Sequence, residues 1–195
     1  MPQSGVQSYR RNLPHIQKDF TPHFVTFYTK SRWILPPEAR DITIDSCIHD
    51  DRVRYALYVA VVMPDHVHMI LTPLIDRRLC ETFSLIRIMQ SIKGASARAI
   101  NQKLNRNGPV WQEESFDHVL RSSEGLDAKV EYVLQNPVRK GLVGDWHGYR
   151  WCWKRANAAC GDETDLARKY VAQDAFVRGL HARCGLHSSF VDGHR

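Results

Sequence analysis

Two histidines separated by a single residue, His66 and His68, offer the first chemistry in this sequence. They follow the turn-forming pair Pro64-Asp65, so we expect them at the start of a strand. Because side chains alternate between the two faces of a strand, both imidazoles would lie on one face and Val67 on the other. Two imidazoles held in this way form half of a metal site. Two solvent-facing or hydrogen-bonded histidines on an antiparallel sheet give the same pattern, and the residues alone leave both interpretations open.

A tyrosine and an asparagine four residues apart offer the second chemistry. Tyr132 and Asn136 lie in a segment with a helical pattern, so they share one face of the helix. A tyrosine hydroxyl has a pKa of roughly 10, and it becomes a good nucleophile only when a neighbour, such as a cation, stabilises the phenolate. The amide oxygen of Asn136 could complete a metal shell with the two histidines. The alternative is a core-facing tyrosine and an Asn136-Pro137 pair that ends the helix.

Positive charge is concentrated in residues 77–106. This stretch holds seven basic residues against one acidic residue, and its excess of +6 equals the formal net charge of the whole chain. Phosphate backbones are the natural partner of such a stretch, although a solvated helix face has the same composition. The candidate nucleic-acid contacts are Arg87, Lys93, Arg98 and Lys103, with Arg139 and Lys140 as a second, smaller cluster.

Strand and helix patterns alternate along the chain. Strands are expected at residues 24–29, 54–63 and 66–71, and two short ones at 110–111 and 118–120. A first helix opens at Pro36-Pro37 and runs to about residue 50, and a second covers residues 79–104, where Gly94 could divide it. Ser122-Ser123 caps a third helix that ends near Asn136-Pro137.

The order of these elements is strand, helix, strand, strand, helix, strand, helix. Its first six elements match the split β-α-β pattern, so we predict an α+β fold with a ferredoxin-like antiparallel sheet and helices packed on its faces. Residues 1–20 are predicted to be a basic N-terminal arm, and residues 21–153 the folded domain. Residues 154–195 would form a C-terminal extension, in which residues 165–180 have the pattern of an amphipathic helix.

The composition excludes several classes of protein. With 195 residues, 43% of them hydrophobic, the chain can bury a core and is not collagen-like or disordered throughout. The longest apolar run, residues 55–63, is far shorter than the ~20 residues that span a membrane, and no signal peptide is recognisable. Five scattered cysteines without a Cys-x-x-Cys pair argue against a disulfide scaffold or a thiolate zinc site. We therefore expect a cytoplasmic protein without a membrane partner.

Taken together, the motifs resemble the REP-associated tyrosine transposases, a branch of the HUH single-tyrosine transposases. HUH denotes histidine, a bulky apolar residue and histidine, which here is His66-Val67-His68. The resemblance spans roughly residues 24–153, and its specificity lies in the order and spacing of the motifs. These motifs are Met63-Pro64-Asp65-His66-Val67-His68, Lys93-Gly94, Asn101, Val110-Trp111-Gln112 and the run from Tyr132 to Val143.

The resemblance implies a set of roles. His66 and His68 would bind a divalent metal, Mg²⁺ or Mn²⁺, with Asn136 as the third ligand, and Tyr132 would be the nucleophile. The family's activity is nicking and joining of single-stranded DNA through a 5′-phosphotyrosine intermediate, often near hairpins formed by repeated palindromes. By ligand softness alone the same donors also suit Zn²⁺.

Two departures from the family pattern and two other functions remain to be considered. The residue before the histidine pair is often asparagine in the family, whereas here it is Asp65, an acid beside the proposed metal. The segment after Tyr170 matches no part of the family.

The first alternative function is a non-catalytic nucleic-acid-binding regulatory domain on the same fold. The second is a metal-dependent hydrolase that uses only the histidine pair. The sequence predicts neither the oligomeric state nor the DNA target.

Overall fold

The apolar runs of the sequence form a five-stranded antiparallel sheet in the order β6-β1-β3-β2-β7. The computed structural model describes residues 21–76, 79, 81–120 and 125–156. The strands are β1 (His23–Thr29), β2 (Tyr55–Val62), β3 (His66–Pro73), β6 (Trp111–Val119) and β7 (Cys152–Lys154). The predicted strands at 24–29, 54–63 and 66–71 are thus confirmed. The expected N-terminal arm and the helix expected at residues 165–180 lie outside the described residues.

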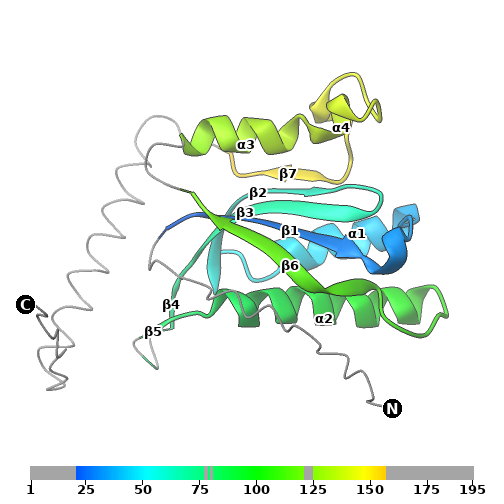
Figure 1. The fold of residues 1–195 in the computed structure, drawn as a ribbon, viewed down its shortest axis with the longest axis horizontal. Coiled ribbons are helices and arrows are strands. Elements are labelled where there is room, and N and C mark those ends of the chain that lie inside the picture. Colours follow the sequence, from blue (N-terminus) through cyan, green and yellow to red (C-terminus); the bar gives the residue numbers. More distant parts are fainter. Residues whose placement is uncertain (1–20, 77–78, 80, 121–124, 157–195) are drawn as a thin grey trace, which may run out of the picture.

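Helices cover both faces of this sheet (Figure 1). Helix α1 (Pro37–Ile48) connects β1 to β2, α2 (Leu85–Lys103) precedes β6, and the two pack against each other on the same face of the sheet. Helix α3 (Leu126–Leu134), followed by the single turn α4 (Asn136–Arg139), lies on the opposite face, over β2 and β3. The strand order β6-β1-β3-β2 with two crossover helices on one face is the predicted ferredoxin-like arrangement, and β7 extends it at the β2 edge.

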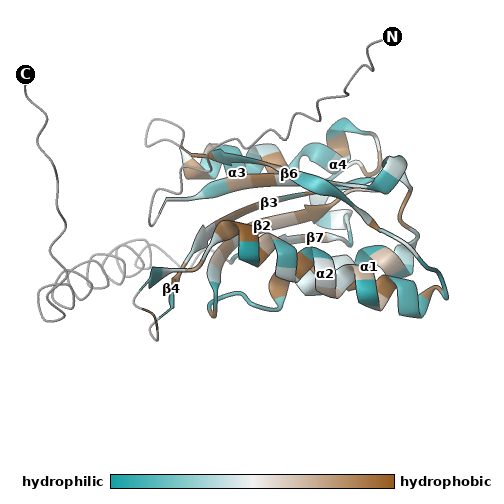
Figure 2. Cartoon of the chain, turned by 60° about the horizontal axis from the view of Figure 1, so that its bottom comes forward, coloured by the Kyte–Doolittle hydropathy of each residue, from teal (hydrophilic) through white to brown (hydrophobic). Residues whose placement is uncertain are grey.

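The sheet therefore separates two hydrophobic clusters. One lies under α1 and α2, and the other lies under α3. Strands β2 and β3 are buried on both faces, which explains why their sequences read as nearly continuous apolar runs (Figure 2). The α1–α2 cluster includes Val25, Phe27, Val67, Met69, Ile88 and Ile92, and the α3 cluster includes Phe24, Val61, Ile70, Val130, Val133 and Leu134.

Helix α2 begins later than predicted and is not divided. The residues expected to form its first turn include β5 (Glu81–Thr82), which pairs with β4 (Ile75–Asp76) in a separate two-stranded sheet. Leu79, expected at the start of this helix, lies outside it and is 65% exposed. The helix passes Gly94 without a break because the turns on both sides are anchored in the core by Ile92 and Ser96.

The C-terminal half of the domain differs from the sequence prediction in two further respects. The two short strands expected around residues 110 and 118 are one strand, β6, because the polar residues between them lie on an exposed edge strand. Asn136-Pro137 ends α3 but starts α4, since proline is well tolerated in a first helical turn. The predicted cap at Ser122-Ser123 lies outside the described residues.

Among the described helices, none combines the length and the apolar character needed to cross a membrane.

Candidate functional site

The turn between β2 and β3 fixes where the histidine pair begins. The backbone N–H of Met63 donates to the carbonyl of His66 at 2.8 Å, which closes the turn over Pro64 and Asp65. The carbonyl of Asp65 accepts two bonds from Thr29 at the end of β1, one from its backbone N–H at 2.9 Å and one from its hydroxyl at 3.0 Å. The start of β3 is therefore tied to both neighbouring strands.

The register of β3 then brings specific partners to the two histidines. Both histidines point to the α3 face of the sheet, since Val67 between them lies in the cluster on the α1–α2 face. Thr26 of β1 lies opposite His68, and Tyr28 lies opposite His66. The sequence prediction that the two imidazoles share one face is confirmed.

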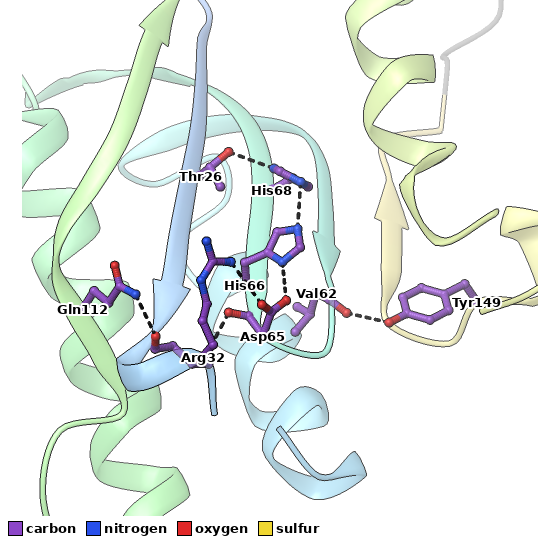
Figure 3. A network of polar contacts seen from close by, with 9 residues as sticks. Thr26, Arg32, Val62, Asp65, His66, His68, Gln112 and Tyr149 are labelled. Carbon is purple, nitrogen blue, oxygen red and sulfur yellow. Dashed lines mark hydrogen bonds and ion pairs between the residues drawn. The ribbon is translucent and has the colours of Figure 1, made fainter. Parts of the chain in front are cut away.

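The two imidazoles are linked to each other and to one partner each (Figure 3). Nε2 of His66 lies 3.1 Å from Nε2 of His68. Nδ1 of His66 lies 2.6 Å from a carboxylate oxygen of Asp65, and Nδ1 of His68 lies 2.8 Å from the hydroxyl of Thr26. Burial raises the pKa of Asp65, but hydrogen bonds from His66 and Arg32 outweigh it and hold the pKa below its usual value. Each Nδ1 is thus occupied, and the two Nε2 atoms face a common point.

The spacing of the two Nε2 atoms suits a single divalent ion. Two nitrogen ligands at right angles, each ~2.1 Å from an ion, stand ~3.0 Å apart, close to the spacing seen here. Hydrogen bonding of the distal ring nitrogen to a carboxylate or hydroxyl is the usual way in which metal-ligating imidazoles are oriented. Within the described residues, no group of three or more His, Cys, Asp or Glu side chains could hold a metal.

His68 is held in the uncharged form that a metal requires. Burial lowers its pKa to about 3, and the positive charges of His66, Arg139 and Lys129 act in the same direction. A metal binds the neutral imidazole, so its binding at His68 needs no proton to be released near neutral pH.

Tyr132 lies on α3, over the sheet face that carries the histidines, and is 47% exposed. Two cations contact its ring, the guanidinium of Arg139 at 4.1 Å and the ammonium of Lys129 at 5.1 Å from the centroid. Lys129 also lies 4.8 Å from the ring centroid of Phe24, which in turn stacks on His68 at 5.5 Å between centroids. Phe24 and Lys129 therefore connect the tyrosine to the histidine pair.

Asn136 follows at the junction of α3 and α4. Its side-chain NH₂ donates to the carbonyls of Tyr132 and Val133 at 3.2 and 3.1 Å, so it satisfies backbone groups at the end of α3. The helix-ending role that the sequence suggested is confirmed. The amide oxygen takes part in neither of these bonds.

The basic residues of α2 lie on the other face of the sheet from the histidine pair. Arg87, Arg98 and Lys103 are exposed there. Lys93 differs, because its ammonium donates to the carbonyl of Glu113 at 2.9 Å and to the hydroxyl of Ser115 at 3.2 Å. Burial lowers the pKa of Lys93, while Glu113 opposes this change. The structure thus uses Lys93 to join α2 to β6, and a role for these four residues in nucleic-acid binding stays a prediction.

Comparison with known proteins identifies the family. Residues 16–135 match the family described as transposase, IS200-like, and this range includes His66, His68 and Tyr132. The chain belongs to this family. The match covers more than half of the chain and confirms the resemblance drawn from the ordered motifs.

Two similar proteins extend the comparison. A Haemophilus influenzae protein described as a REP-associated tyrosine transposase is 25% identical over 92 residues, which are 44% of this chain and 52% of the relative. The chain thus spans about half the length of that relative. The solved structure of a REP-associated tyrosine transposase bound to a REP hairpin aligns with a TM-score of 0.57 and 20% identity, over 77% of this chain and 82% of that one. This likeness supports the α+β fold predicted from the sequence.

Sequence reasoning missed three residues of the candidate site. Thr26 bonds His68 across 42 residues, a contact that only the strand register reveals. Lys129 precedes Tyr132 by three residues, so the helical i, i+3 spacing could have indicated it. Arg32 reaches Asp65 from the turn after β1, and no sequence pattern marks it.

The titration of His68 predicts how the stability of the metal-free protein changes with pH. Its pKa is about 3 in the folded protein, against ~6.5 in an unfolded chain. Since the folded pKa is depressed, the unfolded state takes up the proton first. The free energy of unfolding therefore keeps its full value above about pH 6.5. It decreases as the pH falls toward 3, with a slope of up to about 1.4 kcal/mol per pH unit.

Urea unfolding in the presence of chelator, between pH 7 and pH 5, measures this slope. His68→Gln keeps a polar side chain but cannot be protonated, so it should flatten the dependence. An equal slope in the two proteins would contradict the depressed pKa.

Proposed function

We propose that this transposase nicks and rejoins single-stranded DNA at hairpins, with Tyr132 as nucleophile and a divalent metal, Mg²⁺ or Mn²⁺, as cofactor. The observation that carries the proposal is the distance of 3.1 Å between Nε2 of His66 and Nε2 of His68. The Nδ1 atom of each ring is at hydrogen-bond distance from a partner, Asp65 or Thr26, which orients the ring. The position of Tyr132 on the helix that covers this face, with Lys129 and Arg139 against its ring, supports its role.

His66 and His68 would hold the metal through their Nε2 atoms, and the amide oxygen of Asn136 is proposed as the third ligand. When bound, the metal would neutralise charge that develops on the oxygens of the scissile phosphate. The donor set of two imidazoles and one amide oxygen leaves room for water and phosphate oxygens, which Mg²⁺ and Mn²⁺ prefer.

The chemical step assigned to the chain is a transesterification. The Tyr132 oxygen would form a bond to phosphorus while the bond from phosphorus to the 3′ oxygen breaks. The phenolic proton leaves the tyrosine, and the departing oxygen gains a proton to become a free 3′-hydroxyl. The cations of Lys129 and Arg139 would stabilise negative charge at the phenolate and at the phosphate. Attack by another 3′-hydroxyl reverses the step and rejoins strands without an external energy source.

Single-stranded DNA that forms a hairpin is the proposed substrate. The related structure described above contains a REP hairpin. On this chain, Phe116 of β6 is 61% exposed and lies opposite Thr26, on the face of the histidine pair. An exposed aromatic ring can stack on bases, and Lys129 and Arg139 can pair with phosphates. The strand would therefore lie along the β1–β6 side of this face, next to α3.

A non-catalytic nucleic-acid-binding domain is the second candidate. Arg87, Arg98 and Lys103 lie on the sheet face opposite the histidines, which favours a binding surface separate from the proposed centre. Binding alone would be sensitive to salt, independent of metal and without strand cleavage. A hydrolase that used only the histidine pair would turn over without any covalent intermediate.

Replacing Tyr132 with Phe should abolish covalent protein–DNA adducts and leave DNA binding within about twofold of the wild type, because only the nucleophilic oxygen is removed. The measurement is a denaturing gel of labelled hairpin oligonucleotides incubated with Mn²⁺ or with chelator. Tyr28→Phe is the matched control. The centroid of the Tyr28 ring lies 5.3 Å from that of His66, so Tyr28 is the competing candidate for the nucleophile. Adducts that persist in Tyr132→Phe and vanish in Tyr28→Phe would reverse the assignment.

The two charged faces should contribute differently. Changing both Lys129 and Arg139 to Gln should lower the nicking rate at saturating DNA, because these cations adjoin the nucleophile. Changing both Arg98 and Lys103 to Gln should weaken binding and reduce the salt slope of log K by about 1.4 for two lost phosphate contacts. The nicking rate at saturation should then stay at the wild-type value. A comparable loss of that rate in both double variants would refute a division between the faces.

A further inference from the structure

Asp65 lies between His66 and the guanidinium of Arg32. One carboxylate oxygen lies 2.6 Å from Nδ1 of His66, and the other accepts a hydrogen bond from the guanidinium of Arg32 at 3.1 Å (Figure 3). Its backbone is fixed as well, because its carbonyl accepts two hydrogen bonds from Thr29. Both carboxylate oxygens are thus engaged by protein partners, which disfavours Asp65 as a direct metal ligand.

Arg32 reaches this carboxylate from an unusual backbone conformation. Ser31 and Arg32 have φ angles of 54° and 56°, in the left-handed region that side-chain-bearing residues rarely adopt. The turn after β1 folds the Arg32 side chain back, so that its guanidinium lies 3.8 Å from the ring centroid of Tyr28. Tyr28 in turn contacts the ring of His66. Backbone strain of this kind persists where the surrounding contacts require it. Here the contacts of Arg32 are with Tyr28 and Asp65, and both of these residues contact His66.

We propose that Asp65 and Arg32 form a positioning pair for His66. The carboxylate of Asp65 would accept the Nδ1 proton of His66, so the lone pair of Nε2 is the one aimed at the metal. Arg32 would hold the carboxylate in place by binding its second oxygen. This inference rests on the metal site of the proposed function.

The anionic acceptor has a consequence that a neutral amide lacks. A carboxylate that accepts the Nδ1 proton makes Nε2 a stronger donor to a cation, whereas an asparagine oxygen in the same place would fix the orientation alone. A comparison of a carboxylate with an amide at this position therefore separates two effects, the choice of the His66 tautomer and the affinity of the site for the metal. Each of them can be measured by itself.

The experiment uses the full chain in two assays. Nitrogen-15 NMR of the metal-free protein reports which ring nitrogen of His66 carries the proton. Titration with Mn²⁺, followed by electron paramagnetic resonance of the free ion, gives the affinity. The variants are Asp65→Ala, Asp65→Asn and Arg32→Gln. Asp145→Ala is the matched control, because Asp145 contacts Nδ1 of the exposed His147 at 2.7 Å in the same manner.

We expect Asp65→Ala to release the His66 tautomer and to weaken Mn²⁺ binding about 10- to 100-fold, the range typical of lost outer-shell partners. Asp65→Asn should keep the tautomer and lose affinity, Arg32→Gln should show a smaller loss, and Asp145→Ala should leave both readouts at His66 unchanged.

An unchanged tautomer and affinity in Asp65→Ala would overturn the proposal. So would an Asp65→Asn variant that binds Mn²⁺ as tightly as the wild type, because the charge of the carboxylate would then add nothing to the affinity. If the wild type bound no Mn²⁺, the proposed function would fail at its cofactor. The tautomer of His66 in the metal-free variants would still test the positioning pair.

Discussion

The convergence of two imidazole nitrogens on one point depends on the register of β3 between its neighbours. Nε2 of His66 and Nε2 of His68 can face each other at 3.1 Å only while each Nδ1 is held by its own partner, Asp65 or Thr26. Thr26 comes from β1 and Asp65 from the β2–β3 turn, so a shift of one residue would turn both histidines to the opposite face. The bonds from Thr29 to the Asp65 carbonyl keep that register.

Helices cover both faces of the sheet, and the two faces carry different sets of charged and aromatic residues. On one face α1 and α2 cover a large apolar cluster, and the exposed side of α2 carries Arg87, Arg98 and Lys103. On the other face α3 packs over β2 and β3, and among the described residues Phe116 of β6 is exposed on the same face. The proposed centre lies at this boundary, where the half-buried histidines, the cations Lys129 and Arg139 and an exposed aromatic ring share one face.

The parts of the fold that follow from local patterns were predictable from the sequence. The order of strands and helices, the shared face of His66 and His68 and the end of α3 all depend on the spacing of neighbouring residues. The parts that depend on distant pairing were not predictable. Thr26 meets His68 across 42 residues, β7 finds its place only against β2, and the left-handed turn at Arg32 has no sequence signal. The polar middle of β6 was missed because an exposed edge strand lacks the apolar pattern of a buried one.

The most direct test of the central claim is the position of a bound metal. Crystals of the protein grown with Mn²⁺, with anomalous diffraction recorded at the manganese edge, would locate the ion without assuming its ligands. The account predicts one strong peak about 2.1–2.2 Å from Nε2 of both His66 and His68, with both Nδ1 contacts retained. An ion bound elsewhere, or a histidine pair that stays unliganded at saturating Mn²⁺, would contradict it.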